Sequence, residues 1–284
     1  MGEAKLGIVL RERTVFRLLC VPALVMLVAF YVFPVGRVLL ISVTEPTFGF
    51  GNYAQLGNPS VLRVASVTAR ICGLTTIITL VLAYLVAYTM THSSRRTQLV
   101  MMLGVLLPLW ISVLVRSFAW ITLLRARGVI NNALIGLGVI ERPLELMWNE
   151  LGIVIGMVHY MLPLGILPLL ANMRQINPAL VAAARGLGAS RTEAFRRVFL
   201  PLSLPGIIAA SVLVFIFSLG FYVTPALLGG GRTILITEYI SVQIVELLRW
   251  GTGTMLATML VVIVFSLLGL LARVVDLRQV FGAK

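Results

Sequence analysis

The sequence predicts an all-α protein that crosses a membrane six times. Of its 284 residues, 60% are hydrophobic and 12% are charged, and the mean hydropathy is +1.04. A soluble domain is usually about half apolar and about one quarter charged, so most of this chain needs lipid as its solvent. The apolar runs also exceed the roughly 10-residue alternating segments of a transmembrane β-barrel.

Six apolar segments have the length of a spanning helix, which needs roughly 20 residues. Prolines inside them, such as Pro34, Pro108 and Pro163, are compatible with membrane helices because neighbouring helices satisfy the freed backbone groups. The expected spans run from Leu18 to Ile41, Ser66 to Met90, Gln98 to Leu124, Leu151 to Ala171, Leu204 to Leu227 and Thr254 to Val275.

The distribution of charge gives an orientation. With the N-terminus in the cytoplasm, the cytoplasmic segments hold 14 of the 23 basic residues and four of the ten acidic residues. The positive-inside rule then places both termini in the cytoplasm. We expect a cytoplasmic segment over 1–17, a transmembrane domain over 18–275 and a cytoplasmic tail over 276–284. The first apolar stretch is too long for a cleaved signal peptide, and the scattered charges form no nucleic-acid surface.

Residues for metal or covalent chemistry are sparse. Cys20 and Cys72 fall inside expected spans without a metal-ligand spacing, and His92 and His159 are far apart in sequence. No phosphate-binding Gly-x-x-x-x-Gly-Lys-Ser/Thr motif occurs, and the glycine run 229–231 is typical of a turn. The sequence therefore predicts no catalytic residue, no metal site, no disulfide and no cofactor.

The loop between the fourth and fifth spans has a readable pattern of helix signals. Asn177 can cap a helix that starts at Pro178 and stops at Gly188. Ser190 can open a second helix, with Glu193 completing a capping box. We expect this second helix to end at Pro201, before the fifth span. Its apolar stripe at helical spacing comprises Ala194, Phe195, Val198 and Phe199.

Two interpretations of this loop stay open on the residues alone. It is either an ordered connector or a docking surface for a cytoplasmic partner, because a compact two-helix unit can fill a groove in another protein.

The loop resembles the coupling loop of binding-protein-dependent ABC importer permeases. The similarity lies in Ala182-Ala183-Ala184, Gly188-Ala189 and Leu200-Pro201; a glutamate typical of the family aligns with Ala182. Further strings resemble the spermidine/putrescine-type branch of that family. They are the segments 107–110, 115–120, 128–131, 158–163 and 220–225.

This resemblance implies a fold like that of a type I ABC importer permease in a bacterial inner membrane. It also implies three kinds of partner: a cytoplasmic ABC ATPase dimer, a second permease that is related but different, and a periplasmic substrate-binding protein. The residues implied in ATPase coupling, with Phe195 and Val198 as docking anchors, are Ala182, Ala183, Ala184, Gly188, Ser190, Glu193, Phe195 and Val198.

Candidate pathway residues lie in the third, fourth and fifth spans. Ser112, Arg116 and Trp120 recur every four residues on one helix face. An arginine within a span usually faces the bundle interior or water, although Arg116 is close enough to the outer end to snorkel. Ser211, Ser218 and Tyr222 share a face of the fifth span, where helix packing is the alternative role. His159 and Tyr160 complete the set.

The substrate stays open at this point. A polyamine needs carboxylates or aromatic faces along its path, yet the expected spans contain no Asp or Glu, and Pro225 stands where an aspartate is expected in well-known spermidine permeases. The resemblance implies a polyamine or related small organic solute, with an opine or an amino-acid derivative as alternatives. An ion-coupled secondary transporter is disfavoured, because it would need ionisable groups at mid-membrane and paired repeats.

Overall fold

The computed structural model describes residues 19–274, and within that range every regular element is helical. The elements are α2 (Phe33–Thr44), α3 (Pro59–His92), α4 (Arg95–Trp110), α5 (Val113–Leu124), α6 (Val129–Gly136), α7 (Glu150–Met173), α8 (Pro178–Gly186), α9 (Arg191–Ala194), α10 (Leu200–Leu219), α11 (Val223–Gly229), α12 (Ile236–Ser241) and α13 (Trp250–Val274), with short 3₁₀ or π segments η1 (Val28–Val32), η2 (Gly51–Gly57), η3 (Phe195–Phe199) and η4 (Val242–Glu246).

Five continuous helices are long and apolar enough to cross a membrane, and a bent pair of helices makes six if it is counted as one span. The continuous ones are 19–44, 59–92, 150–173, 191–219 and 250–270. The all-α, six-span expectation is therefore confirmed. The expected segments 1–17 and 276–284 lie outside the described residues, as do the first residue of the first span and the last residue of the sixth.

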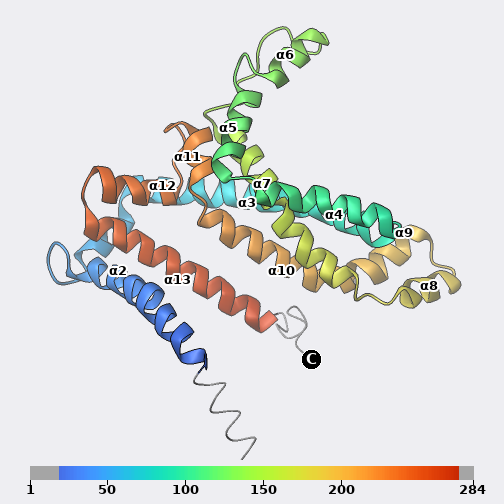
Figure 1. Ribbon diagram of the computed structural model, residues 1–284, viewed down its shortest axis with the longest axis horizontal. Helices are drawn as coiled ribbons and strands as arrows, with labels where there is room; N and C mark the ends of the chain where they lie inside the picture. Colours follow the sequence, from blue (N-terminus) through green and yellow to red (C-terminus); the bar gives the residue numbers. More distant parts are fainter. Residues whose placement is uncertain (1–18, 275–284) are drawn as a thin grey trace, which may run out of the picture.

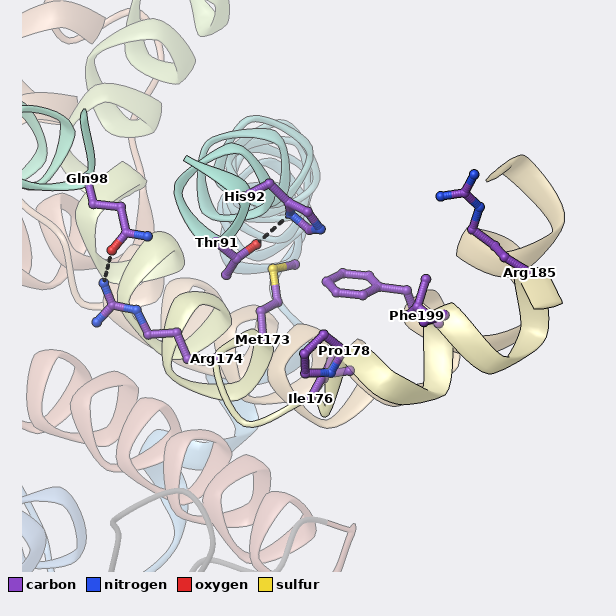
Figure 2. A pocket seen from close by; sticks show the side chains of 11 residues that line it. Thr91, His92, Gln98, Met173, Arg174, Ile176, Pro178, Arg185 and Phe199 are labelled. Carbon is purple, nitrogen blue, oxygen red and sulfur yellow. Dashed lines mark hydrogen bonds between the residues drawn. The ribbon is translucent and has the colours of Figure 1, made fainter. Parts of the chain in front are cut away.

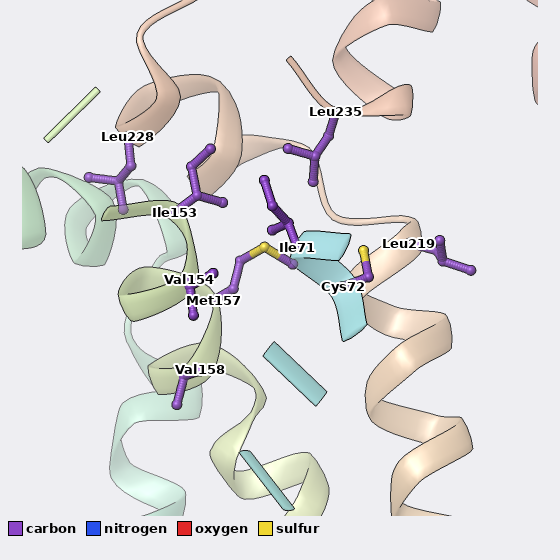
Figure 3. Close-up of a cluster of buried hydrophobic side chains, with 9 residues drawn as sticks. All are labelled: Ile71, Cys72, Ile153, Val154, Met157, Val158, Leu219, Leu228 and Leu235. Carbon is purple, nitrogen blue, oxygen red and sulfur yellow. The ribbon is translucent and has the colours of Figure 1, made fainter. Parts of the chain in front are cut away.

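The centre of the bundle consists of α3, α7 and α10, which pack against one another. Toward one end, the buried core includes Ile71 and Cys72 of α3 and Ile153 and Met157 of α7, as Figure 3 shows. Helix α13 packs on α10 and α2, whereas the most apolar window of the first span has no buried residue. Apart from its contacts with α13 and η2, the first span therefore faces its surroundings.

Small residues allow the central helices to approach closely. A Cβ atom on Gly165 of α7 would lie 3.1 Å from the Cβ of Ala83 on α3. On α10, a Cβ atom at Gly206 would lie 2.7 Å from the Cβ of Asn172. Membrane helices associate largely through such tight packing, because lipid provides no hydrophobic drive between them.

The third span is not the straight helix expected over 98–124. Helix α4 ends at Trp110, α5 begins at Val113, and the chain bends by 101° between them. Figure 1 shows α5 and α6 projecting away from the layer of long helices. We call α5 and α6 (residues 113–136) the side arm. The side chain of Arg116 on α5 bonds across this bend to the Ile111 carbonyl.

The fifth span also differs from the expected range of 204–227. It begins in the loop at Arg191 and runs through η3 into α10, so the expectation that Pro201 ends a helix was wrong. Pro201 lies in the first turn of α10, where a missing N–H is tolerated in a membrane helix. The helix stops at Leu219, and Gly220 separates it from the short helix α11.

The two ends of the bundle carry different structures. Helices α8 and α9 lie at one end of the long helices, and α12 lies toward the other (Figure 1). Helix α3 runs between these ends over 34 residues, which corresponds to about 51 Å at 1.5 Å per residue.

Candidate functional site

The loop between α7 and α10 folds as two short helices joined by a glycine corner. Asn177 accepts a hydrogen bond from the backbone N–H of Ala179 at 2.9 Å, and Pro178 opens α8, as the sequence predicts. Helix α8 ends at Gly186, and Gly188 has a left-handed φ of +96°. A residue with a Cβ rarely adopts this conformation, so Gly188 fixes the corner.

The second helix begins with the predicted capping box. The Ser190 hydroxyl accepts from the backbone N–H of Glu193 at 3.2 Å, and the Glu193 carboxylate accepts from the backbone N–H of Ser190 at 3.0 Å. Arg197 lies 3.8 Å from the same carboxylate at an exposed position. Both helix starts of the loop are therefore fixed by local hydrogen bonds.

The apolar stripe of the second helix faces the protein's own bundle. Ring centroids of Phe195 and Tyr88 are 5.5 Å apart, and those of Phe199 and Tyr88 are 5.2 Å apart. Phe195 also lies edge-on to Tyr84, whose hydroxyl lies 3.0 Å from that of Ser203. Phe195 thus holds the loop against α3, a use of this side chain that the sequence pattern alone does not separate from docking.

The loop is exposed at the tip and outer face of α8 and along the polar face of the second helix. Leu187 is 91% exposed at the glycine corner, and Leu180 is also exposed. The coupling candidates Ala182, Ala183 and Gly188 are exposed as well. Sequence analysis did not single out Leu187, although a large apolar residue between two glycines at a helix end is a recognisable signal.

A cavity of about 470 Å³ lies between α8 and the ends of α3 and α7. Figure 2 shows Phe199 pointing toward His92 and Met173, while Arg174 reaches the Gln98 side chain at 3.4 Å. Arg185 of α8 also lines this cavity. Because its ionisable lining groups are basic or neutral, the cavity has a positive character.

Four of the six candidate pathway residues come together where α5 meets α7. The Arg116 guanidinium carbon lies 4.9 Å from the ring centroid of Tyr160. One turn further along α5, Trp120 Nε1 donates to His159 Nδ1 at 3.2 Å. Arg116 is 6% exposed, so it does not snorkel to the surface of this chain.

The other two candidates lie apart from each other. Ser218 is fully buried in α10, and its hydroxyl has no hydrogen-bond partner among the described residues. Tyr222 lies beyond the end of α10 at the cap of α11 and is 44% exposed. The expectation that Ser211, Ser218 and Tyr222 share one helix face was therefore wrong, because Gly220 ends the helix before Tyr222.

Helix α11 forms the contact layer between the side arm and α7. The hydroxyls of Ser117 on α5 and Thr224 on α11 are 3.0 Å apart in a buried position. A Cβ atom on Gly156 of α7 would lie 2.5 Å from Leu228 Cδ1 and 2.7 Å from Thr224 Cγ2. Only glycine at position 156 leaves room for α11 here.

No group of three or more His, Cys, Asp or Glu side chains that could hold a metal is found in residues 19–274.

The acidic residues nearest the sixth span include Glu238 in α12. Burial raises the pKa of the Glu238 carboxyl above its ordinary value, and the nearby Glu246 adds to the shift.

These features define a polytopic α-helical membrane protein with a helical loop at one end and a broken span beside its core. The chain belongs to the family described as binding-protein-dependent transport system inner membrane component, whose family model matches residues 78–278. It is therefore an inner-membrane component of a transport system and not an enzyme.

Two relatives agree with this assignment. The spermidine/putrescine transport system permease protein PotB of Haemophilus influenzae is 32% identical over 80% of this chain and 82% of its own length. PotB of Escherichia coli is 30% identical over 75% of this chain and 77% of its own length.

A solved structure shares the fold. It is a bacterial ABC transporter involved in the import of the acidic polysaccharide alginate, and it matches 95% of this chain and 99% of its own with a TM-score of 0.73 at 19% identity. The type I importer-like fold expected from the sequence is confirmed.

Proposed function

We propose that this chain forms half of the solute pathway of an ATP-driven importer and that its loop over 177–201 receives a cytoplasmic ABC ATPase. The docking proposal rests on the structure of the loop, whose two helix starts are capped and whose Leu187 is exposed. The aromatic contacts of Phe195 and Phe199 with Tyr88 hold the loop to α3, and the helix that carries both phenylalanines continues directly into α10, so that a displacement of the tip is passed to both helices.

The remaining partners follow from the family. A second, related permease completes the pathway, and a periplasmic binding protein delivers the solute; the shared fold with an alginate transporter solved together with its periplasmic protein supports this assembly. Both termini lie in the cytoplasm in this proposal, on the side of the arginine-rich loop.

The proposed substrate is a polyamine or a related small organic solute, because two PotB relatives carry the name of a spermidine/putrescine system. The carboxylates that bind a polycation would come from the partner permease and the binding protein. An opine or an amino-acid derivative is the second candidate, because the spans expected from the sequence contain no acidic residue that would bind a polycation. The residues proposed to line the pathway are Arg116, Trp120, His159, Tyr160, Ser218 and Tyr222.

The docking proposal is tested by co-expressing the chain with the ATPase, second permease and binding protein of neighbouring reading frames. Changing Leu187→Ser should reduce the ATPase retained on the purified permease roughly tenfold, equivalent to about 1.4 kcal/mol. Leu137→Ser is the matched control, because Leu137 is also a leucine at a helix end and is 77% exposed, but it lies on the side arm. Equal ATPase retention in both variants would contradict the docking site.

Sidedness is tested separately with cysteines introduced at two exposed positions, in a background with Cys20→Ala. Ala183→Cys should react with a membrane-impermeant maleimide only after cell lysis, whereas Phe48→Cys, toward the other end of the bundle, should react in intact spheroplasts. Labelling of Ala183→Cys before lysis would refute the cytoplasmic loop. The substrate class is then read from stimulation of ATPase activity across spermidine, putrescine and an opine panel.

A further inference from the structure

The bend in the third span creates a hydrogen-bonding problem. The last four carbonyl groups of a helix have no partner within that helix, and the hydrocarbon core of a membrane provides no water to satisfy them. At the end of α4, Ile111 N–H reaches the Pro108 carbonyl at 3.3 Å, which satisfies only part of this need. A break at this position therefore requires a donor from elsewhere in the protein.

Arg116 supplies that donor from the first turn of the next helix. Its Nη2 donates to the Pro108 carbonyl and, at 3.0 Å, to the Ile111 carbonyl. A cation is also favourable at a helix C-terminus, where the helix dipole places partial negative charge. These contacts explain why an arginine, costly at this depth, is kept nearly fully buried.

The other face of the guanidinium is held by α7. The Arg116 side chain lies over the Tyr160 ring, and Tyr160 in turn packs on Phe221 with ring centroids 4.4 Å apart. Arg116 Nε and Nη1 are buried and have no hydrogen-bond partner among residues 19–274. The ring face compensates a cation through its quadrupole, so removing this ring would leave the guanidinium unsupported.

A second contact ties the side arm to α7 one turn away. Trp120 of α5 donates to His159, the residue next to Tyr160. Helix α7 leads through residues 174–177 into the loop that begins with Asn177. The position of the side arm is thus linked to the same helix that carries the proposed ATPase-docking loop.

We propose that Arg116 is a positioning residue that closes the end of α4, sets the direction of the side arm and ties it to α7 through Tyr160. In this role Arg116 does not bind the solute. The transport part of this inference rests on the proposed function, whereas the structural part stands on the chain alone. A lysine is a poor replacement, because a single ammonium group cannot match the planar, multi-donor guanidinium that lies flat on an aromatic ring.

The structural part is tested by spin-label distances in the purified complex. Labels are placed at Leu103→Cys on α4 and Val129→Cys on α6, both exposed, in a background with Cys20→Ala and Cys72→Ala. R116M, R116K and Y160L should shift or broaden the distance distribution, and Y160F, which keeps the ring face, should leave it unchanged. Unchanged distributions in R116M and Y160L would overturn the proposal.

Solute-stimulated ATPase activity separates positioning from solute binding. R116M and Y160L should lower the stimulated rate roughly tenfold, within the usual range of coupling energies, without changing the solute concentration for half-maximal stimulation. A raised half-maximal concentration with native distances would make Arg116 a solute ligand and refute positioning.

Two further outcomes are informative. Absence of stimulation in the unmodified complex would count against the proposed function, while the distances would still decide the role of Arg116. If R116M does not assemble, Y160L and Y160F decide the role of Arg116, because Y160F keeps the aromatic ring that supports the guanidinium and Y160L removes it. Altered distances in Y160L alone support the proposal, and native distances in both variants contradict it.

Discussion

Two short helices of this protein end in the same sequence, Gly-Leu-Gly, but lie in different parts of the structure. Helix α6 ends at Gly136 and α8 at Gly186; in both, an exposed leucine and a left-handed glycine follow, at 137–138 and at 187–188. Helix α8 lies at the end of the bundle, whereas α6 lies at the tip of the side arm (Figure 1).

The difference lies in what holds each corner. The α8 corner is followed by a capped helix whose phenylalanines pack on Tyr84 and Tyr88, so it is joined to the core. The α6 corner is followed by residues 137–149 without a helix, held instead by the buried side chain of Asn131. A Gly-Leu-Gly helix end is therefore not a functional site by itself; its attachment to the bundle decides what it can transmit.

The largest expected effect is at the base of the side arm. Gly156→Val would place methyl groups where Leu228 and Thr224 already lie, and such overpacking should destabilise the protein by roughly 3 kcal/mol. Thermal unfolding of the detergent-purified chain measures this. Gly104→Val is the control, since no atom lies within 4 Å of its added Cβ. Equal melting temperatures would show that the arm's base is not tightly packed.

The next effect is at the α6 corner. Asn131→Ala removes the amide that accepts from Leu144 N–H at 2.8 Å and donates to the Leu144 carbonyl at 3.0 Å. Leaving these groups unpaired should cost roughly 2 kcal/mol and speed proteolysis within 137–149. The neighbour Asn132→Ala, which loses only an exposed 3.4 Å bond, should behave like the unmodified chain. Equal cleavage rates would remove Asn131 as the holder of this corner.

A smaller effect is expected at the α8 corner. Ser190→Ala removes one half of the capping box and should cost about 1 kcal/mol. Amide hydrogen exchange should then accelerate at Glu193 and its neighbours but stay unchanged in α3. Thr192→Ala, an exposed position in the same helix, serves as control. Faster exchange across the whole bundle would instead mean that the loop and the core unfold together.

The smallest effect concerns the ion pair between Arg70 of α3 and Glu150 of α7. Both side chains are substantially exposed, and exposed pairs contribute roughly 0–1 kcal/mol. Arg70→Gln should therefore change the melting temperature much less than Asn131→Ala. A larger loss than that of Asn131→Ala would show that exposed polar contacts, and not buried ones, fix this side of the bundle.

Sequence predicted the helix starts of the loop because they depend on neighbours within three residues. Asn177, Ser190 and Glu193 form the expected caps, and the six apolar segments were located by length and hydropathy. The apolar stripe with Phe195 was also visible. Its direction was not, because only the position of Tyr84 and Tyr88 on a distant helix decides that it faces inward.

The bend of the third span could not be predicted for a similar reason. Proline is compatible with a membrane helix, so Pro108 gave no reason to divide the span. At the bend, carbonyl groups before the break meet the guanidinium of Arg116 on α5, with the Tyr160 ring of α7 on the other side, and no sequence pattern shows this contact. The early end of the fifth span is more local, and Gly220 was its available signal.

The unbroken helix from Arg191 to Leu219 has a consequence for the order of events during transport. No break separates the second helix of the loop from the rest of the fifth span, so the fifth span would turn together with the loop as one rod. On the other side, residues 174–177 form a hydrogen-bonded turn between α7 and α8. In the proposed mechanism, a pull on this corner would therefore move the fifth span directly through one helix and would act on the fourth span, with the side arm behind it, through the turn at 174–177.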